Sequence, residues 1–493
     1  MCIRDRGIGL LNLDSQIAEY IIEKFVADNI PILVMPGGNP LHQLFVRPNF
    51  SAVNSWSTVS RHAEFITSPR ETANVMRRAM HHLRSGTPGP VVVELPQDIV
   101  GQEIPDNEQT YSSPKIMTSV PSVSDIRDAA KALVDAKEPL IWAGAGVMSA
   151  RATEELRALA ELLEVPVYTS LVGKSASDER HPLALGSGGM TTTGPARQWL
   201  DESDVMFAVG TSLTTTPYGQ RFDPNKFLIH CVNDVNEINK DTVCDVGLVG
   251  DARLTLTLMI DHVKDLIGEE GRTTGVTKRI KAAKDAWWAS WMPYLENDSS
   301  PISPYRVIWE LNQNLDKESS IVTHDAGAPR DQIGPFYIAT NPHSYVGWGK
   351  TTHLGASIPL MIGAKKAMPD RMCVAFMGDA AFGMSGLDME TAVRANLPIT
   401  VVLLNNGIMA TYPGGTPTAR EQFGVTHMSG DYGKIAMGMG AEAIYVSEAS
   451  ELADALQQAS RFNKEGKTVM IDVKSRNEDS RAPHRFVEKN SVN

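Results

Sequence analysis

The stretch from residue 372 to residue 406 constrains the fold more than any other part of this chain. It begins with an apolar run, residues 372–377, which leads into Gly378-Asp379, and it ends with a second apolar run, residues 399–404, which leads into Asn405-Asn406. Short, continuous apolar runs are typical of strands buried on both faces of a parallel sheet. Two such runs joined by a crossover of this length predict a right-handed βαβ unit with parallel, neighbouring strands.

The crossover between the two apolar runs has a helical pattern. Ser385 and Asp388 are placed like a capping box, which predicts that a helix begins there. Leu397-Pro398 ends the helix, because proline lacks the backbone N–H that a helix interior requires. The chain is therefore expected to pass from one strand through a helix to the next strand.

Asp379 and Asn406 follow the two predicted strands at equivalent carboxyl ends. Neighbouring strands lie about 4.8 Å apart, so a carboxylate and an amide oxygen can reach one hard cation and leave room for phosphate oxygens. Ligands of open α/β sheets also lie beyond the carboxyl ends of the strands. These residues predict a magnesium and diphosphate site; the alternative is a structural βαβ unit with an incidental Asp and Asn.

Gly378-Asp379-Ala380, the gap and Asn405-Asn406 resemble the cofactor signature of thiamine-diphosphate-dependent enzymes in the acetolactate synthase and benzoylformate decarboxylase branch. The resemblance implies that Mg²⁺ is bound by Asp379, Asn406 and the main-chain oxygen of Ile408. It also implies that the cofactor is bound by Gly378, Ala380, Ala381 and Asn406.

One residue departs from this signature, because the family usually has glycine where this chain has Ala380. If the position required a positive φ, alanine would cost about 1 kcal/mol. The oxalyl-CoA decarboxylase and 2-hydroxyacyl-CoA lyase relatives tolerate serine there, and their motif resembles residues 378–386. We therefore expect Ala380 to be compatible with cofactor binding.

A second segment is similar to the part of these enzymes whose main chain contacts the diphosphate. Residues 321–328 form a predicted strand that runs into a turn of small residues. The resemblance implies that Gly327 and Ala328 contact the diphosphate. His324 lies at the end of this strand, and a local hydrogen bond is favoured for it over a catalytic role.

By its spacing from Asp379, Leu354 matches the bulky apolar residue over which the family folds thiamine diphosphate into a V. The resemblance implies that the N–H of Leu354 and the carbonyl of Thr352 hold the aminopyrimidine ring. The alternative role of Leu354 is plain core packing. His353, Thr411 and Tyr412 are the weakest candidates and are placed only near the expected substrate.

Composition limits the classes of partner. The chain has 493 residues, 42% hydrophobic residues and a net charge of −12, which argues against nucleic acid or an anionic membrane as partner. Its four cysteines form no CxxC pair, so a disulfide framework or zinc site is not expected, and a reducing cytoplasm is. The sequence contains no apolar segment long enough for a membrane span.

We expect an α/β protein of three domains with parallel sheets flanked by helices. The boundaries are a partial pyrimidine-binding domain at 7–105, a Rossmann-like middle domain at 120–262 and a diphosphate- and magnesium-binding domain at 300–476. In the middle domain Gly144-Ala145-Gly146 is a weak dinucleotide signature, and a strand-to-helix turn without a ligand is favoured. The motif near FAD in acetolactate synthases is present only as Arg221-Phe222-Asp223-Pro224, so support for FAD is poor.

The resemblance implies decarboxylation and/or carboligation of a 2-oxo acid, as in acetolactate synthase, by a homodimer or homotetramer with thiamine diphosphate and Mg²⁺. One alternative is a 2-hydroxyacyl-CoA lyase or oxalyl-CoA decarboxylase acting on an acyl-CoA. The other is a non-catalytic cofactor-binding protein, because the family's activating glutamate would fall upstream of Met1. Glu19 and Glu23 follow that position, so no catalytic residue is predicted in this N-terminally short chain.

Overall fold

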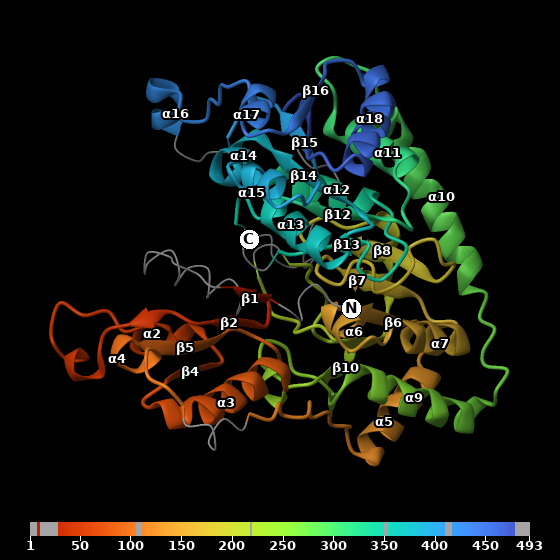
Figure 1. The fold of residues 1–493 in the computed structure, drawn as a ribbon. Coiled ribbons are helices and arrows are strands. Elements are labelled where there is room, and N and C mark those ends of the chain that lie inside the picture. Colours follow the sequence, from red (N-terminus) through yellow and green to blue (C-terminus); the bar gives the residue numbers. More distant parts are fainter. Residues whose placement is uncertain are drawn as a thin grey trace. The chain divides into compact units, whose positions relative to one another are not determined.

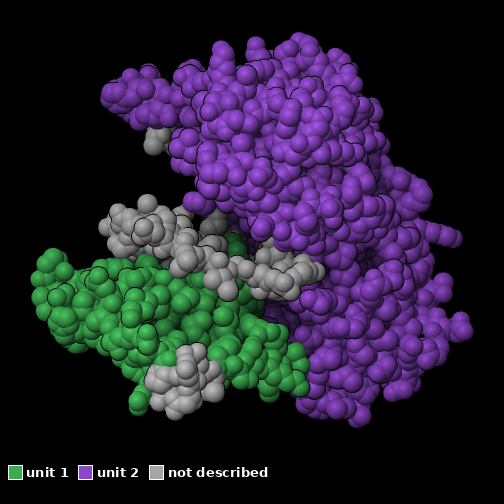
Figure 2. Space-filling model, viewed as in Figure 1, with its two compact units in different colours: residues 1–119 green, residues 120–493 purple. Residues whose placement is uncertain are grey.

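This computed structural model describes residues 7–9, for which only the backbone is considered, and residues 28–104, 111–216, 219–349, 353–409 and 417–478. The chain divides into two compact units, residues 1–119 and 120–493, which Figure 2 distinguishes by colour. The expected helix that precedes residue 28, including Glu19 and Glu23, lies outside the described residues.

Unit 1 contains a parallel sheet with the order β1-β2-β5-β3, and β4 also pairs with β5 (Figure 1). Alternate apolar residues of β5 are buried under α3, whose inward face carries Val75 and Ala79. The elements are β1 (Gly7–Gly9), β2 (Ile32–Val34), β3 (Gly37–Gly38), α2 (Ala52–Trp56), β4 (His62–Phe65), α3 (Thr72–Arg84), β5 (Val91–Pro96) and α4 (Gln97–Val100).

The first half of unit 2 is a middle domain built on a parallel sheet with the order β11-β10-β9-β6-β7-β8. The chain moves outward in one direction from β6 and then in the other direction from β9, so the strand order reverses between these two strands. The elements are α5 (Val123–Asp135), β6 (Pro139–Ala143), α6 (Ala145–Ser149), α7 (Thr153–Leu163), β7 (Val167–Ser170), β8 (Ala184–Gly188), α8 (Gly194–Glu202), β9 (Val205–Val209), β10 (Phe227–Val232), β11 (Val246–Val249) and α9 (Ala252–Ile267).

The second half of unit 2 is a C-terminal domain whose parallel sheet has the order β13-β12-β14-β15-β17-β16. Here the strand order reverses between β12 and β14. The elements are α10 (Val276–Leu295), α11 (Pro304–Asn314), β12 (Ser320–His324), α12 (Ala328–Phe336), β13 (Tyr345–Val346), α13 (Ser357–Ala367), β14 (Met372–Gly378), α14 (Asp379–Ser385), α15 (Asp388–Arg394), β15 (Thr400–Asn405), α16 (Pro417–Phe423), α17 (Tyr432–Gly438), β16 (Glu442–Val446), α18 (Leu452–Lys464) and β17 (Val469–Lys474).

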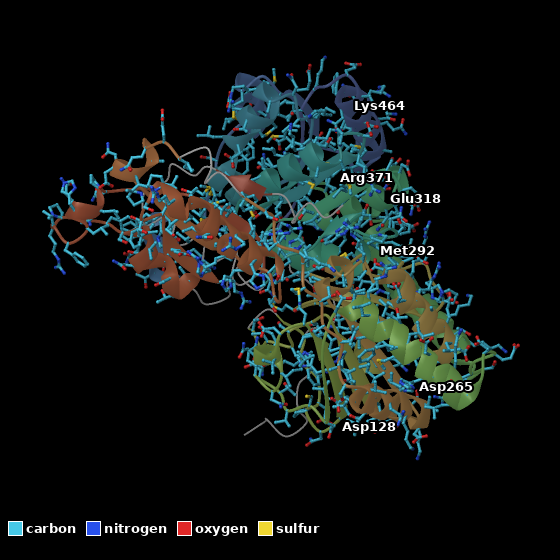
Figure 3. The ribbon with its side chains drawn as sticks, turned by 60° about the horizontal axis from the view of Figure 1, so that its bottom comes forward. Asp128, Asp265, Met292, Glu318, Arg371 and Lys464 are labelled. Atoms are coloured by element: carbon cyan, nitrogen blue, oxygen red, sulfur yellow. The ribbon has the colours of Figure 1, made fainter. Side chains whose placement is uncertain are left out.

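Helix α10 runs from the middle domain to the C-terminal domain (Figure 1). Met292, near its end, lies between Asp265 of α9 and Arg371 before β14 in Figure 3. The ring of Trp287 stacks on Phe336 of α12 with centroids 5.6 Å apart. Trp288 of the same helix also contacts Trp309 of α11, so the tryptophans of α10 pack on neighbouring elements of the C-terminal domain.

A buried ion pair also joins the two halves of unit 2. The Lys174 ammonium donates to Glu179 at 2.7 Å and to the Ser187 hydroxyl at 2.8 Å, and Glu179 accepts the N–H of Ala339 at 2.7 Å. The side chains of Lys174 and Glu179 are 1% and 7% exposed, so each charge depends on the other. Removal of one partner of such a buried pair is strongly destabilising.

The predicted fold class and the central βαβ unit are confirmed. Strands β14 and β15 are parallel neighbours in which Gly378 pairs with Leu404. The predicted capping box is wrong, because Ser385 is the last residue of α14 and its hydroxyl donates to the carbonyl of Gly355 at 2.6 Å. Helix α15 begins at Asp388 without a side-chain cap.

Within the described ranges no helix is both long and apolar enough to cross a bilayer.

Candidate active site

The candidate site lies at the carboxyl ends of β12, β14 and β15, where the strand order reverses. Ligands of doubly wound sheets bind in the crevice at this kind of switch point. Gly327 follows β12 and Asp379 follows β14, and these strands are paired from Ser320–Met372 to His324–Phe376. The topology therefore brings the predicted diphosphate segment next to the predicted metal segment.

Gly327 precedes α12 and leaves the crevice open. Its φ is +81°, a conformation that favours glycine, and a Cβ placed on it would have no atom within 4 Å. The backbone N–H groups at the start of α12, beginning with Ala328, lack intrahelical partners by geometry, and the helix dipole favours an anion there. The open side of Gly327 therefore has the space and the polarity that a diphosphate requires.

Asp379 is 1% exposed and its carboxylate accepts two backbone hydrogen bonds. One oxygen accepts the N–H of Ala380 and the other accepts the N–H of Gly407, each at 2.7 Å. Burial raises the pKa of Asp379, an effect that these backbone hydrogen bonds oppose. A cation at this carboxylate would replace the hydration that the charge loses on burial.

Asn406 lies one residue before Gly407, so the contact of Gly407 with Asp379 brings the Asn406 segment to the same strand ends. The side-chain oxygen of Asn406 accepts the N–H of Ile408 at 3.0 Å. Gly407 itself is held in place because its carbonyl accepts the N–H of Met428 at 2.9 Å.

The donor set fits Mg²⁺ completed by phosphate oxygens. It consists of one carboxylate, one amide oxygen and one main-chain carbonyl, and Mg²⁺ is commonly bound by one or two carboxylates together with substrate phosphates. In the part of the chain that the structure describes, no group of three or more His, Cys, Asp or Glu side chains could hold a metal ion.

Ala380 and Ala381 lie in the first turn of α14. Ala380 is not among the residues with positive φ, so the departure from glycine costs no backbone strain. Gly378, which precedes the helix, has an extended conformation, and a Cβ on it would meet only the Cγ of Pro329 at 3.9 Å. The local backbone therefore tolerates this chain's version of the signature.

Leu354 is half-buried and packs against a small apolar cluster formed by Ala326, Trp348 and Ala356. Both roles predicted for Leu354, core packing and contact with the cofactor, are compatible with this position. Thr352 and the two weak candidates Thr411 and Tyr412 lie outside the described residues, and His353 is half-buried.

His324 is fully buried at the end of β12. Its Nδ1 atom lies 3.2 Å from the carbonyl oxygen of Asp325, and its ring stacks on Trp348 at 5.0 Å. The prediction of a local hydrogen bond is confirmed.

Sequence reasoning missed Asp325, which is fully buried at the carboxyl end of β12. Its carboxylate accepts from the N–H of Ala326 at 2.8 Å, the N–H of Gly355 at 2.9 Å, and both the N–H and hydroxyl of Ser357 at 3.0 and 2.6 Å. The signal that identified Asp379, an acidic residue between a buried strand and small residues, is present here too.

A second group of polar side chains missed from the sequence supports β15. Asp472 of β17 accepts the side-chain amide of Asn405 at 3.0 Å and the N–H of Gly433 at 3.3 Å. Burial raises the pKa of Asp472. Burial, together with the negative charges of Asp379 and Asp472, raises the pKa of the adjacent Tyr432.

The Gly144-Ala145-Gly146 turn of the middle domain packs against the protein's own backbone. The N–H of Gly144 donates to Val209 at 2.9 Å, and the N–H of Gly146 donates to Gly210 at 2.8 Å. A Cβ on Gly146 would lie 2.6 Å from the Cα of Gly210. Close backbone packing therefore explains why glycines are needed in this turn. The expectation that FAD is not well supported stays a prediction.

Comparison with known proteins identifies both halves of unit 2. Residues 126–259 match the model of the thiamine pyrophosphate enzyme central domain, and residues 325–473 match the model of the C-terminal thiamine-pyrophosphate-binding domain. The probable acetolactate synthase large subunit of Methanococcus aeolicus is 29% identical over 93% of this chain and 79% of its own length. The acetolactate synthase large subunit of Corynebacterium glutamicum is 28% identical over 96% of this chain and 76% of its own length. The acetolactate synthase isozyme 3 large subunit of Escherichia coli K12 is 28% identical over 90% of this chain and 79% of its own length.

Proposed function

Because this chain belongs to the thiamine pyrophosphate enzyme family, and is thus a thiamine-diphosphate-dependent enzyme, we propose that it acts on a 2-oxo acid by decarboxylation, carboligation or both. The acetolactate synthase large subunits among its relatives support this reaction class. Thiamine diphosphate, when bound, supplies the capacity to stabilise a carbanion at the former carbonyl carbon.

The observation that carries the proposal is the switch point between the paired strands β12 and β14, where open space beside Gly327 and the buried carboxylate of Asp379 follow neighbouring strand ends. We assign the diphosphate to this crevice, against Gly327, Ala328, Gly378, Ala380 and Ala381. Asp379, Asn406 and the carbonyl of Ile408 would hold Mg²⁺. We also propose that the protein is a homodimer or homotetramer, the assembly that the resemblance implies.

Calorimetric titration of thiamine diphosphate in the presence of magnesium tests this assignment. Asp379→Ala should weaken binding by about 100-fold or more, since even residues that only orient a metal ligand contribute 10- to 100-fold. The matched control is Asp370→Ala, because Asp370 is exposed near the amino end of β14. Magnesium-dependent binding by Asp379→Ala at the affinity of the unsubstituted protein would refute the assignment.

A thioester substrate is the second candidate. The likeness of residues 378–386 to the oxalyl-CoA decarboxylase and 2-hydroxyacyl-CoA lyase motif favours it, and Gly386 is required there because a Cβ would lie 2.6 Å from the ring of Phe382. Parallel assays with pyruvate and with oxalyl-CoA separate the two reactions. Consumption of the thioester without consumption of pyruvate would replace the first proposal with the second.

A further inference from the structure

We propose that Asp325 and Ser385 are positioning residues that clamp the peptide of Gly355 from both sides and thereby hold Leu354 in place for the aminopyrimidine end of thiamine diphosphate. This inference rests on the proposed function. It assigns roles to two residues that are not among the predicted cofactor-binding and magnesium-binding residues.

The first half of the clamp is Asp325. Its carboxylate accepts four hydrogen bonds, from Ala326 on its own segment and from Gly355 and Ser357 on the segment that starts α13. The side chain is fully buried, and hydrogen bonds to a charged acceptor are stronger than those between neutral groups. Asp325 therefore fixes the segment around Leu354 to the end of β12.

The second half of the clamp is Ser385. Its hydroxyl donates to the carbonyl of Gly355 at 2.6 Å, which links the same segment to the last residue of α14. Helix α14 begins at Asp379, the predicted magnesium ligand. The clamp thus connects the end of β12 with the last residue of α14, the helix that follows β14.

Gly355 is suited to being held in this way. Its φ is +87°, and a Cβ on it would lie 2.8 Å from the Ser385 hydroxyl, so the close approach of Ser385 requires glycine. Both polar groups of Gly355, its N–H and its carbonyl, have partners on other segments. Leu354 precedes this fixed residue and packs against Ala326 and Trp348, so its backbone has little freedom to shift.

The position of the clamp predicts a selective effect. Asp325 and Ser385 contact the Leu354 segment but are not among the residues assigned to magnesium, whereas a loss of overall folding would weaken every ligand of the crevice. Magnesium pyrophosphate is a probe of the diphosphate end alone, and thiamine diphosphate is a probe of both ends. The ratio of the two dissociation constants therefore separates positioning from stability.

The experiment measures Kd for magnesium thiamine diphosphate and for magnesium pyrophosphate in the unsubstituted protein, Asp325→Asn and Ser385→Ala. Asn keeps the shape of Asp325 but cannot accept hydrogen bonds on both sides. Loss of a hydrogen bond to a charged group should raise Kd for thiamine diphosphate about tenfold in Asp325→Asn, and less in Ser385→Ala, while Kd for pyrophosphate changes less than about twofold. Hydrogen exchange of the peptide that contains Gly355 should accelerate in both variants without any ligand.

The matched control is Asp316→Asn. Asp316 lies before the amino end of β12 and also accepts from a backbone N–H, that of Glu318, and from a serine hydroxyl, that of Ser319, but it is exposed. Neither Kd should change in this control. If Asp325→Asn does not fold, the milder Ser385→Ala variant and its exchange rate provide the test.

Two results would overturn the inference while leaving the proposed function intact. One is equal weakening of both ligands in Asp325→Asn and Ser385→Ala, and the other is no weakening of either ligand. Failure of the unsubstituted protein to bind thiamine diphosphate would instead overturn the proposed function and the inference with it.

Discussion

The two sheets of unit 2 have the same doubly wound design but differ at the point where the strand order reverses. In the middle domain the crevice between β6 and β9 is filled, because the backbone of Gly210 lies against Gly144 and Gly146 and accepts the N–H of Gly146. In the C-terminal domain the crevice between β12 and β14 is open beside Gly327. A glycine after a buried strand thus leaves space at the strand end, and the opposing segment decides whether backbone or a ligand can occupy that space.

Electrostatics differ between the two crevices in the same direction. The C-terminal crevice contains two buried carboxylates, Asp325 and Asp379, that accept backbone N–H groups. In the middle domain a Cβ on Gly144 would instead meet the backbone of Gly210 and the side chain of Thr211. Buried charge is costly to maintain, so two buried carboxylates at neighbouring strand ends are consistent with a binding role there.

The largest effect is expected when a methyl group is added to the filled crevice. Gly146→Ala places a Cβ 2.6 Å from the Cα and 2.9 Å from the carbonyl oxygen of Gly210, and neither atom belongs to a flexible side chain. Overpacking of this kind costs about 1–3 kcal/mol of unfolding free energy, which urea denaturation would measure. The Kd for thiamine diphosphate should not change. A stable Gly146→Ala variant that no longer binds the cofactor would show instead that the middle-domain turn takes part in cofactor binding.

A glycine-to-alanine substitution in the open crevice should instead reduce cofactor affinity more than it reduces stability. Gly327→Ala meets no atom within 4 Å, so only its positive φ costs free energy, about 1 kcal/mol. The added methyl group occupies space assigned to the diphosphate, and the Kd for thiamine diphosphate should rise about tenfold or more. Calorimetry and denaturation of the same preparation would show whether affinity falls more than stability.

A smaller effect is expected at the joint between the two domains. Burial lowers the pKa of Lys317 to about 8, although Glu179 opposes the shift. A lysine with a lowered pKa in the folded state is destabilising while it is charged in both states, and this cost is relieved as pH rises from about 8 to the ordinary value of 10.5. Lys317→Met should therefore be more stable than the unsubstituted protein at pH 7, by about 1–2 kcal/mol after allowance for partial exposure.

The measurement for Lys317 is the difference in unfolding free energy between the two proteins across this pH range. The difference should shrink toward zero as pH approaches 10.5. Lys131→Met, on the exposed surface of α5, is the control, and its difference should not shrink in this way over the range from 8 to 10. If the difference in unfolding free energy between Lys317→Met and the unsubstituted protein increased with pH, burial would not be lowering the pKa of Lys317.

Much of the site could be predicted from the sequence because its signals are local. An apolar run that ends in Gly378-Asp379, and another that ends in Asn405-Asn406, are sufficient to predict adjacent parallel strands with polar residues at their carboxyl ends. The wrong capping box at Ser385 shows the limit of local signals. The Ser385 hydroxyl donates to the carbonyl of Gly355 and does not cap a helix. Gly355 lies 30 residues earlier in the chain, so the sequence around Ser385 does not reveal this partner.

The strands and their parallel pairing can be predicted from the sequence, since the composition of a buried strand and the length of a crossover are local features of the chain. The packing of distant segments decides which glycines face open space and which buried carboxylates accept hydrogen bonds from another segment. Gly146 is closed by Gly210 and Asp325 is bound by Gly355 and Ser357, and all of these partners come from distant segments. The physical reason is that packing and hydrogen-bond satisfaction are settled between segments, after the sheet has brought its strand ends together.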